Sequence, residues 1–425
     1  MSPKATSFKA PIGTVDVLPP ESERLLAFRH LFEDVAREFG FGYLETPVFE
    51  DVGVFQRVGE GTEIVRKEMY EFVDRGDRRL ALRPEGTAPV CRAFAQNRPP
   101  TPWKVWYHAP MFRYERPQAG RNRQHTQVGA EVLGSHDPDV DVEVIALARE
   151  VLRRTGLERV LLLINSMGDR ECRRRYVEAL RDYLRENLGD LDPEDREKVD
   201  DHPMRVLDTK RPDSLDVVRD APTIIDHLDD AAGLHFDRVQ DGLGTLGIPF
   251  ALETRLVRGL DYYTHTTFEF QASALDAAQN TIAGGGRYDG LVEELGGPPT
   301  PGVGFGMGVE RVLLACDAES TFSMPAAHPD VWVIDVHDGT SARDLTQALR
   351  AVGIAAERAF DNRSMRAQMK AADRSGARWA LIVGDKEVAD GTVALRDLRS
   401  GDEQRPVARA DVIGEVVALV KAGEA

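Results

Sequence analysis

The stretch that most constrains how this chain folds runs from Phe112 to Glu131. It holds four arginines and three glutamines, and extended flanks lie on either side of a turn at Pro117–Gly120. This pattern predicts an antiparallel hairpin whose two flanks face one cleft. Guanidinium groups are planar, permanently charged donors that match phosphate oxygens. The hairpin therefore indicates a polyphosphate site, although the stretch alone fits a solvated basic loop equally well.

Length and hydropathy predict an ordinary soluble protein of two or three domains. The chain has 425 residues, of which 42% are hydrophobic, enough for conventional cores. The longest aliphatic run, Val160–Ile164, is far shorter than the roughly 20 residues that span a bilayer. Because no apolar signal region opens the chain, we expect the protein in the cytoplasm.

Cysteine use and charge exclude several classes of protein. Cys91, Cys172 and Cys316 lack paired spacing, so the sequence supports neither a disulfide framework nor a zinc site. The net charge of -17 argues against general affinity for nucleic acids, so such a partner must meet local basic patches. Residues 329–425 are nearly neutral, with 14 basic and 16 acidic side chains. Their closely spaced basic residues form either a basic helix face or a solvated, salt-bridged helix; these residues are Arg358, Arg363, Arg366, Lys370, Arg374 and Arg378.

The order of the periodic segments predicts the domain organisation. A helix is expected over residues 21–39 and a strand over 43–48. Short strand-like runs then alternate with turns and two helices, which suits an antiparallel sheet with helices on one side. Residues 168–247 are charge-rich and helical in character, as an inserted module would be. Prolines near residue 328 mark a boundary, after which strands and helices alternate as in a small α/β domain.

Two further segments carry residues that suggest chemistry. Leu256–Glu269 places Arg258, Tyr262 and Tyr263 before a β-rich alternating run. Pro301–Arg311 is a glycine-spaced strand that leads into an apolar helix with an arginine in its first turns. Between them, the triple glycine at 284–286 lets the backbone approach a ligand closely, and we interpret it as a flexible pocket wall or lid.

Taken in order, these segments resemble the motifs of class II aminoacyl-tRNA synthetases. The Arg258 segment and Ala283–Gly290 are similar to the two signatures that distinguish the histidyl-tRNA synthetases, and the resemblance covers nearly the whole chain from Gly13 onward. It implies an α+β catalytic domain at 1–328, in which helices flank an antiparallel sheet and 168–247 form a helical insertion. An α/β anticodon-binding domain at 329–425 completes the expected fold.

The resemblance also implies an activity and partners. Such an enzyme is a ligase that activates L-histidine with ATP and Mg²⁺ to histidyl-adenylate, and then transfers histidine to the 3′ end of tRNA(His). The family forms homodimers through the helix at 21–39 and the strand that follows it, although an amphipathic core helix would show the same periodicity.

Individual roles follow from the same resemblance. Arg113 and Arg258 would act on the α-phosphate from opposite sides, Arg121 would reach the outer phosphates, and Arg311 would lie against adenine, where His125 also stacks. Tyr263 and Glu131 would hold the imidazole, and the α-amino group would meet Glu85, Thr87 and Gln127. The full expected histidine site comprises Glu85, Gly86, Thr87, Gln127, Glu131, Arg258, Tyr262 and Tyr263. Arg116 and Gln118 would read the extra 5′ guanosine of the tRNA, and the sequence identifies no metal ligand.

The alternation of glycines from Gly302 to Gly308 would give the strand a flat face for adenosine. Three positions depart from the family pattern: Ala119 replaces a common lysine, Asn122 an aromatic, and His125 a phenylalanine. They bear on the adenine and acceptor-stem contacts.

Two other functions are weighed against this one. The first is a non-catalytic paralogue that serves as a regulatory subunit of ATP phosphoribosyltransferase; it typically lacks the tail domain and the catalytic arginine, which this chain has. The second is a class II synthetase for proline, threonine or glycine, whose pocket has no use for the Arg258 and tyrosine combination.

Overall fold

The computed structural model describes residues 8–59, 64–116, 120, 122–207, 209, 211–257, 262–276, 280–324, 328–361, 363–400 and 403–423. The chain divides into two compact units, Met1–Met324 and Pro325–Ala425. Within the described ranges no helix combines the length and the apolar character needed to cross a membrane.

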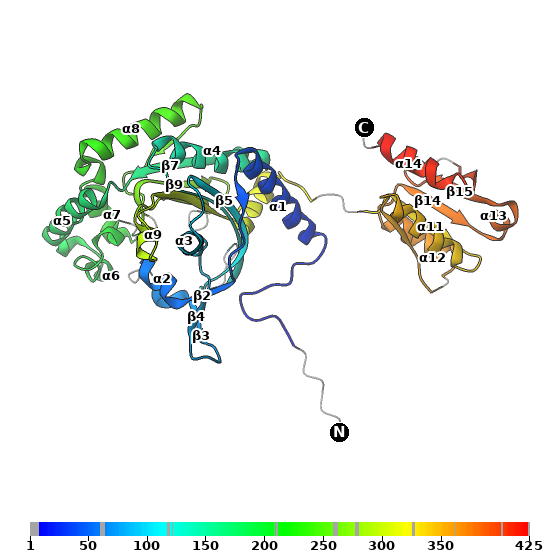
Figure 1. Ribbon diagram of the computed structural model, residues 1–425, viewed down its shortest axis with the longest axis horizontal. Coiled ribbons are helices and arrows are strands. Elements are labelled where there is room, and N and C mark those ends of the chain that lie inside the picture. Colours follow the sequence, from blue (N-terminus) through cyan, green and yellow to red (C-terminus); the bar gives the residue numbers. More distant parts are fainter. Residues whose placement is uncertain are drawn as a thin grey trace, which may run out of the picture. The chain divides into compact units, whose positions relative to one another are not determined.

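An eight-stranded sheet forms the centre of the first unit (Figure 1). Its inner six strands pair antiparallel, while the two edge strands pair parallel to their neighbours. The expected α+β class is therefore confirmed, with a mixed rather than a purely antiparallel sheet. In order across the sheet, the strands are β1 (Gly42–Tyr43), β5 (Trp103–Phe112), β6 (Gln124–Leu133), β11 (Gly302–Gly308), β10 (Thr281–Arg287), β9 (Thr264–Ala272), β7 (Val160–Ser166) and β8 (Ala251–Leu252).

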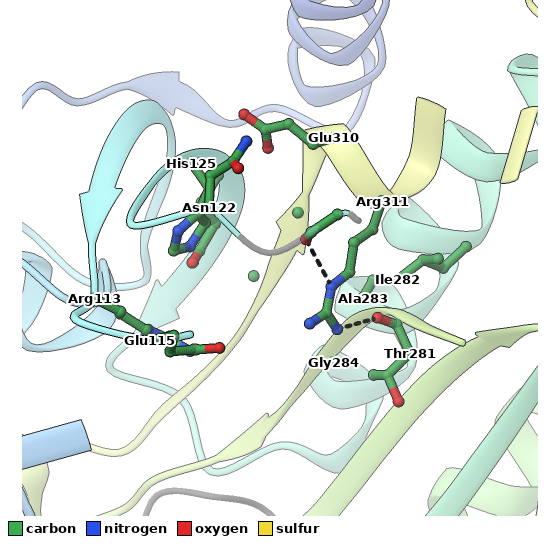
Figure 2. Close-up of a pocket in the computed structure, with 14 residues that line it drawn as sticks. Arg113, Glu115, Asn122, His125, Thr281, Ile282, Ala283, Gly284, Glu310 and Arg311 are labelled. Carbon is green, nitrogen blue, oxygen red and sulfur yellow. Dashed lines mark hydrogen bonds and ion pairs between the residues drawn. The ribbon is translucent and has the colours of Figure 1, made fainter. Parts of the chain in front are cut away.

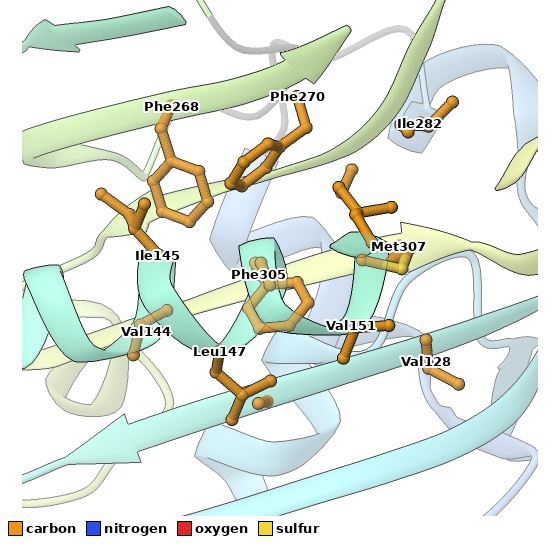
Figure 3. Close-up of a cluster of buried hydrophobic side chains, with 14 of the residues drawn as sticks. Val128, Val144, Ile145, Leu147, Val151, Phe268, Phe270, Ile282, Phe305 and Met307 are labelled. Atoms are coloured by element: carbon orange, nitrogen blue, oxygen red, sulfur yellow. The ribbon is translucent and has the colours of Figure 1, made fainter. Parts of the chain in front are cut away.

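Helix α4 (Pro138–Arg154) shows how sequence places a helix against this sheet. Asp137 accepts a hydrogen bond from the Asp139 backbone N–H, and Pro138 occupies the first turn, so the start of the helix is well defined. Its apolar stripe faces the aromatic side chains of β9 and β11 (Figure 3). Helices α1 (Glu21–Glu38) and α10 (Val309–Glu319) contribute buried residues to the same core.

A second core is built largely by helices and by one face of β5, and Ala81 of a three-stranded sheet joins it. This sheet has the order β2 (Phe49–Asp51), β4 (Arg79–Leu82), β3 (Tyr70–Val73). The strand expected at 43–48 is interrupted here, because β1 ends at Tyr43 and β2 begins at Phe49. Arg83 explains the gap: its guanidinium donates to the carbonyls of Thr46 and Pro47, at 2.9 and 3.3 Å, in place of a strand partner. The accompanying helices are α2 (Val52–Gly59), a π-helix (Ile64–Glu68), α3 (Thr87–Asn97) and α9 (Leu291–Glu294).

Between β7 and β8 the chain is helical throughout its regular elements. A buried carboxylate at Asp195 organises part of this region, since it accepts hydrogen bonds from Ser214 and Lys198, both at 2.9 Å. The elements are α5 (Arg170–Glu186), α6 (Pro193–Arg196), α7 (Pro212–Arg219) and α8 (Asp230–Thr245), with 3₁₀ turns at Leu188–Asp190, Pro203–Val206 and Ile224–His227.

The second unit is an α/β fold with its own core, as expected. Its sheet has the order β13, β12, β14, β15, β16, in which the first three strands are parallel and the last two join antiparallel. The elements are β12 (Val331–Asp335), α11 (Thr340–Ala351), β13 (Ala356–Arg358), α12 (Met365–Arg374), β14 (Trp379–Val383), α13 (Asp385–Asp390), β15 (Thr392–Asp397), β16 (Arg405–Ala408) and α14 (Val412–Gly423).

Candidate active site

The arginine-rich segment forms the expected antiparallel pair. Strands β5 and β6 are in register from Trp103 opposite Leu133 to Phe112 opposite Gln124. Arg113, just beyond β5, donates from Nε to the Pro84 carbonyl at 2.8 Å. The predicted contacts of Gln118 and Arg121 lie outside the described residues.

A polar pocket opens between this hairpin, β10 and the start of α10 (Figure 2). Arg113 and Arg311 lie on opposite sides of it. Arg311 is oriented by hydrogen bonds to the carbonyls of Thr281 and Gly120, at 3.0 and 3.3 Å. Two guanidinium groups facing one cavity make it suited to an anionic ligand.

His125 lines the same pocket as a neutral ring. Burial lowers the pKa of His125 to about 3, and the nearby Arg113 and Arg311 add to this effect. Because the imidazole is uncharged, it can stack on a planar ligand without repelling the guanidinium groups of Arg113 and Arg311.

The buried carboxylate of Glu131 lies deeper, on β6. One oxygen accepts a hydrogen bond from the Thr87 hydroxyl at 2.8 Å, and the other from the Tyr288 hydroxyl at 2.6 Å. Burial raises the pKa of Glu131 to about 8, although both hydroxyl donors oppose the shift. The sequence predicted partial burial for Glu131, whereas its exposed fraction is 0%.

Two tyrosines in this cluster were missed by sequence analysis. Tyr288 contacts Glu131 directly, and the Tyr107 hydroxyl accepts a hydrogen bond from Gln127 Nε2 at 2.8 Å. The signal for Tyr288 was available in the segment Ala283–Gly290, but Tyr107 lies in an apolar strand without any distinguishing motif.

Tyr262 and Tyr263 are both buried and their rings lie 4.7 Å apart. Tyr262 also meets Tyr288 edge to face, with ring centroids 5.9 Å apart. The structure thus brings these tyrosines together with Glu131. Arg258, the residue expected to accompany them, lies outside the described residues.

The segment Glu85–Gly86–Thr87 joins this cluster at the start of α3. The Glu85 carboxylate accepts from the backbone N–H groups of Thr87 and Ala88, at 2.7 and 2.8 Å. Burial raises the pKa of Glu85, and the two N–H donors counteract this. Gly86 leaves space for a ring, because a Cβ there would lie 2.4 Å from Tyr107 Cζ.

The glycines of β11 provide room for side chains as well as for a nucleotide. A Cβ at Gly304 would lie 1.6 Å from Glu131 Oε2, and one at Gly306 would lie 2.3 Å from Gln127 Nε2. Gly306 and Gly308 also line the polar pocket. The flat glycine face therefore serves the buried carboxylate cluster in addition to the cavity expected for adenosine.

The triple glycine at 284–286 is not a lid. These residues lie in the middle of β10, which pairs with β9 on one side and β11 on the other. Gly284 does form part of the pocket wall. Central pairing satisfies the backbone on both sides, so the wall is fixed rather than flexible.

The remaining polar residues of interest lie at the edge of the pocket or outside it. Arg116 is exposed and does not belong to the pocket lining. The carboxylates of Glu115 and Glu310 line the pocket, and Glu310 accepts from the Thr126 N–H at 2.7 Å. Among described residues, the one group of three metal-ligand types is Asp169, Cys172 and Asp229, in which both aspartates cap helices.

Two family models match the chain: histidyl-tRNA synthetase over residues 13–312 and anticodon binding domain over residues 330–419. The chain belongs to the histidyl-tRNA synthetase family. Histidine–tRNA ligases of Rhodococcus opacus (strain B4) and Nocardia farcinica (strain IFM 10152) are 48% and 47% identical to it, over 99% and 97% of this chain and 100% and 98% of theirs.

Solved structures agree with this family. Apo histidyl-tRNA synthetase of S. aureus superposes with a TM-score of 0.82 at 33% identity, covering 96% of this chain and all of the other. A Bacillus halodurans protein described as an ATP phosphoribosyltransferase regulatory subunit/histidyl-tRNA synthetase shares the fold, with a TM-score of 0.65 at 21% identity and coverage of 90% of this chain and 100% of the other. The relatives that match over nearly their full length are named histidine–tRNA ligases. They therefore support the aminoacylation function and not the regulatory alternative.

Proposed function

We propose that this chain is an ATP-dependent histidine–tRNA ligase. The carboxylate of L-histidine attacks the α-phosphorus of ATP, the bond to the β-phosphate oxygen breaks, and diphosphate leaves. The 3′-terminal ribose hydroxyl of tRNA(His) then attacks the carbonyl carbon of histidyl-adenylate and displaces AMP. The observation that carries this proposal is the buried Glu131 cluster beside a cavity faced by Arg113 and Arg311.

The cavity is the proposed ATP site. Arg311 and neutral His125 would lie against adenine, and Arg113 would approach the α-phosphate. Arg121 is proposed for the outer phosphates. Magnesium would supply charge neutralisation on the phosphates, and the carboxylates of Glu115 and Glu310 are the hard oxygen ligands that this wall offers.

The tyrosine-rich cluster is the proposed histidine site. Tyr263 and Glu131, which are both buried, would form hydrogen bonds with the two imidazole nitrogens. A side chain without an imidazole would leave these buried polar groups unpaired, and the free-energy cost of that selects for histidine. Tyr262 would complete the wall. Glu85, Thr87 and Gln127 would accept from the α-amino group, with Gly86 providing space, and Arg258 would stabilise the charge that develops during attack.

The remaining partners belong to the same proposal. Arg116 and Gln118 would meet the 5′ end of the tRNA, and the domain at 329–425 would meet its anticodon. Exposed apolar residues around β1–β3 suit a homodimer interface; they include Tyr43, Val48, Phe49, Phe72 and Val73. We place the enzyme in the cytoplasm, where its tRNA is found.

ATP–diphosphate exchange with a panel of amino acids tests the assignment without tRNA. Histidine should support exchange, while proline, threonine and glycine should not, because their side chains leave Glu131 without an imidazole partner. Exchange with one of these three and none with histidine would contradict the proposed substrate. Exchange with no amino acid at all would favour the non-catalytic alternative.

A further inference from the structure

The buried ring of Tyr107, in the middle of β5, fills a space that two glycines leave for it. A Cβ at Gly86 would lie 2.4 Å from Tyr107 Cζ, and a Cβ at Gly129, its partner on β6, would lie at the same distance. Any larger residue at either position would displace the ring. Packing from both sides therefore fixes where the Tyr107 hydroxyl lies.

This hydroxyl meets the side-chain amide of Gln127, whose Nε2 donates to the Tyr107 oxygen at 2.8 Å. Gly306 leaves room for that nitrogen, because a Cβ there would lie 2.3 Å from Nε2 but 3.5 Å from Oε1. Gln127 lines the polar pocket, and within the described ranges no group donates to its Oε1. The amide thus turns its NH2 group to Tyr107 and keeps its oxygen for a ligand.

A second acceptor decides where the proton of the Tyr107 hydroxyl points. Burial is the main cause of the raised pKa of Glu131, and the Tyr107 hydroxyl is one of three hydroxyl donors that oppose it. Burial also raises the pKa of Tyr107 well above its usual value, so this hydroxyl keeps its proton. A carboxylate is a stronger acceptor than an amide oxygen. The single proton therefore goes to Glu131, and the lone pairs of the oxygen are left for Gln127.

We propose that Tyr107 is a positioning residue for the amino acid substrate: it holds the Gln127 amide so that Oε1 accepts from the α-ammonium group of histidine. The inference rests on the proposed function and adds a residue to its substrate site. An amide that turns freely presents its oxygen or its NH2 group, and the NH2 group cannot accept from an ammonium group. Tyr107 removes the second orientation through a chain of hydrogen bonds that ends on Glu131.

Removal of the Tyr107 hydroxyl should weaken the binding of ligands that carry an α-amino group. Tyr107→Phe keeps the ring between its two glycines, so the packing is retained. When histidine is bound to this variant, Gln127 still turns Oε1 to the ammonium group, and Nε2 loses the acceptor that Tyr107 supplied. With 3-(imidazol-4-yl)propanoate, which lacks the amino group, the amide is free to turn its NH2 group to the pocket, and no such cost arises.

Calorimetric titration of the full-length protein with both ligands measures this difference. The Kd for the propanoate divided by the Kd for histidine should fall by about ten-fold in Tyr107→Phe. Any effect on the imidazole cancels in this ratio, because both ligands carry that ring. A ratio within twofold of the unmodified value would overturn the inference, since a purely structural role of Tyr107 weakens both ligands alike.

Tyr288→Phe is the matched control for this titration. It also removes a buried hydroxyl that donates to Glu131, at 2.6 Å, whereas the Gln127 amide is bonded to Tyr107. This control should weaken both ligands and leave their ratio unchanged. A fall in the ratio as large as that of Tyr107→Phe would overturn the inference, because orientation of Gln127 would then not be the cause.

A double substitution provides the second arm of the test. In a Gln127→Ala background, Tyr107→Phe should not change the ratio further, because no amide is left to orient. Additive falls would overturn the inference. Histidine-dependent ATP–diphosphate exchange by the unmodified enzyme separates the two levels of the argument. Its absence would refute the proposed function, whereas normal exchange with an unchanged ratio in Tyr107→Phe would refute this inference alone.

Discussion

At the scale of single residues, Glu131 is the centre of the buried cluster that it forms with Thr87 and Tyr288. It is completely buried, and each oxygen already accepts one hydroxyl hydrogen bond. A carboxyl in this setting resists ionisation, because charge is poorly solvated in the interior. The same group is therefore central both to the proposed recognition of histidine and to the expected pH dependence of stability.

Glu131→Gln should flatten the pH dependence of unfolding. Burial raises the pKa of Glu131 from 4.5 to about 8, so between these pH values the folded protein keeps a proton that the unfolded chain has lost. Stability consequently falls as pH rises through this window, by about 4 kcal/mol for this one group. Denaturant titrations at pH 5 and pH 8 should show a smaller difference for the variant.

Glu197→Gln provides the comparison, because Glu197 is an exposed carboxylate at the end of α6. It should retain the pH dependence of the unmodified enzyme. Equal slopes for Glu131→Gln and the unmodified chain would show that Glu131 ionises normally.

At the scale of elements, strand β11 shows how a strand with glycines at alternate positions supports the proposed site. Its glycines leave the space that Glu131 and Gln127 fill from the neighbouring β6. Because the interior is closely packed, added atoms here must displace a functional side chain or the backbone.

Gly304→Ala should therefore be much more harmful than Gly308→Ala. The new Cβ at 304 would meet Glu131 Oε2 at 1.6 Å and the backbone oxygen of Ala130 at 2.6 Å, whereas at 308 the nearest atoms belong to Arg311 at 4.0 Å. Overpacking of this kind costs about 1–3 kcal/mol. Urea unfolding should show this loss of stability for Gly304→Ala alone. The same variant should show a raised KM for histidine in ATP–diphosphate exchange. Equal stability of the two variants would contradict the packing argument.

The elements also show what the sequence could and could not predict. The antiparallel pairing of the two flanks was predicted from their extended character, while most of the expected turn lies outside the described residues. Most expected site residues that the structure describes meet in one region. Tyr107 was missed because its role arises only from the register of β5 against β6, which places it opposite Gly129. The prediction of a flexible wall or lid at 284–286 was wrong, because glycine content does not reveal that both edges of β10 are paired.

At the scale of the whole molecule, the proposed dimer can be tested by the molar mass of the protein in solution. Phe49 and Phe72 are 51% and 41% exposed and contact each other edge to face, with ring centroids 6.1 Å apart. Phe72→Asp should shift the protein from dimer to monomer in light scattering, because a charge is costly to bury in an apolar interface.

Leu234→Asp is the matched control for this experiment. Leu234 is 71% exposed on α8, at a distance from β3 within the same unit (Figure 1). It should leave the mass unchanged. If the unmodified protein is a monomer, the proposed dimer does not exist. If Phe72→Asp remains a dimer, the interface lies elsewhere.

Strand β11 has a further consequence during synthesis on the ribosome. It is the last strand of the large sheet to be translated, yet it lies in the middle, between β6 and β10. Until residue 308 has emerged, the nascent chain holds two partial sheets whose inner edges are unpaired, and such edges attract other chains. Premature termination before this strand should accordingly yield inactive, aggregating fragments rather than a partly working enzyme.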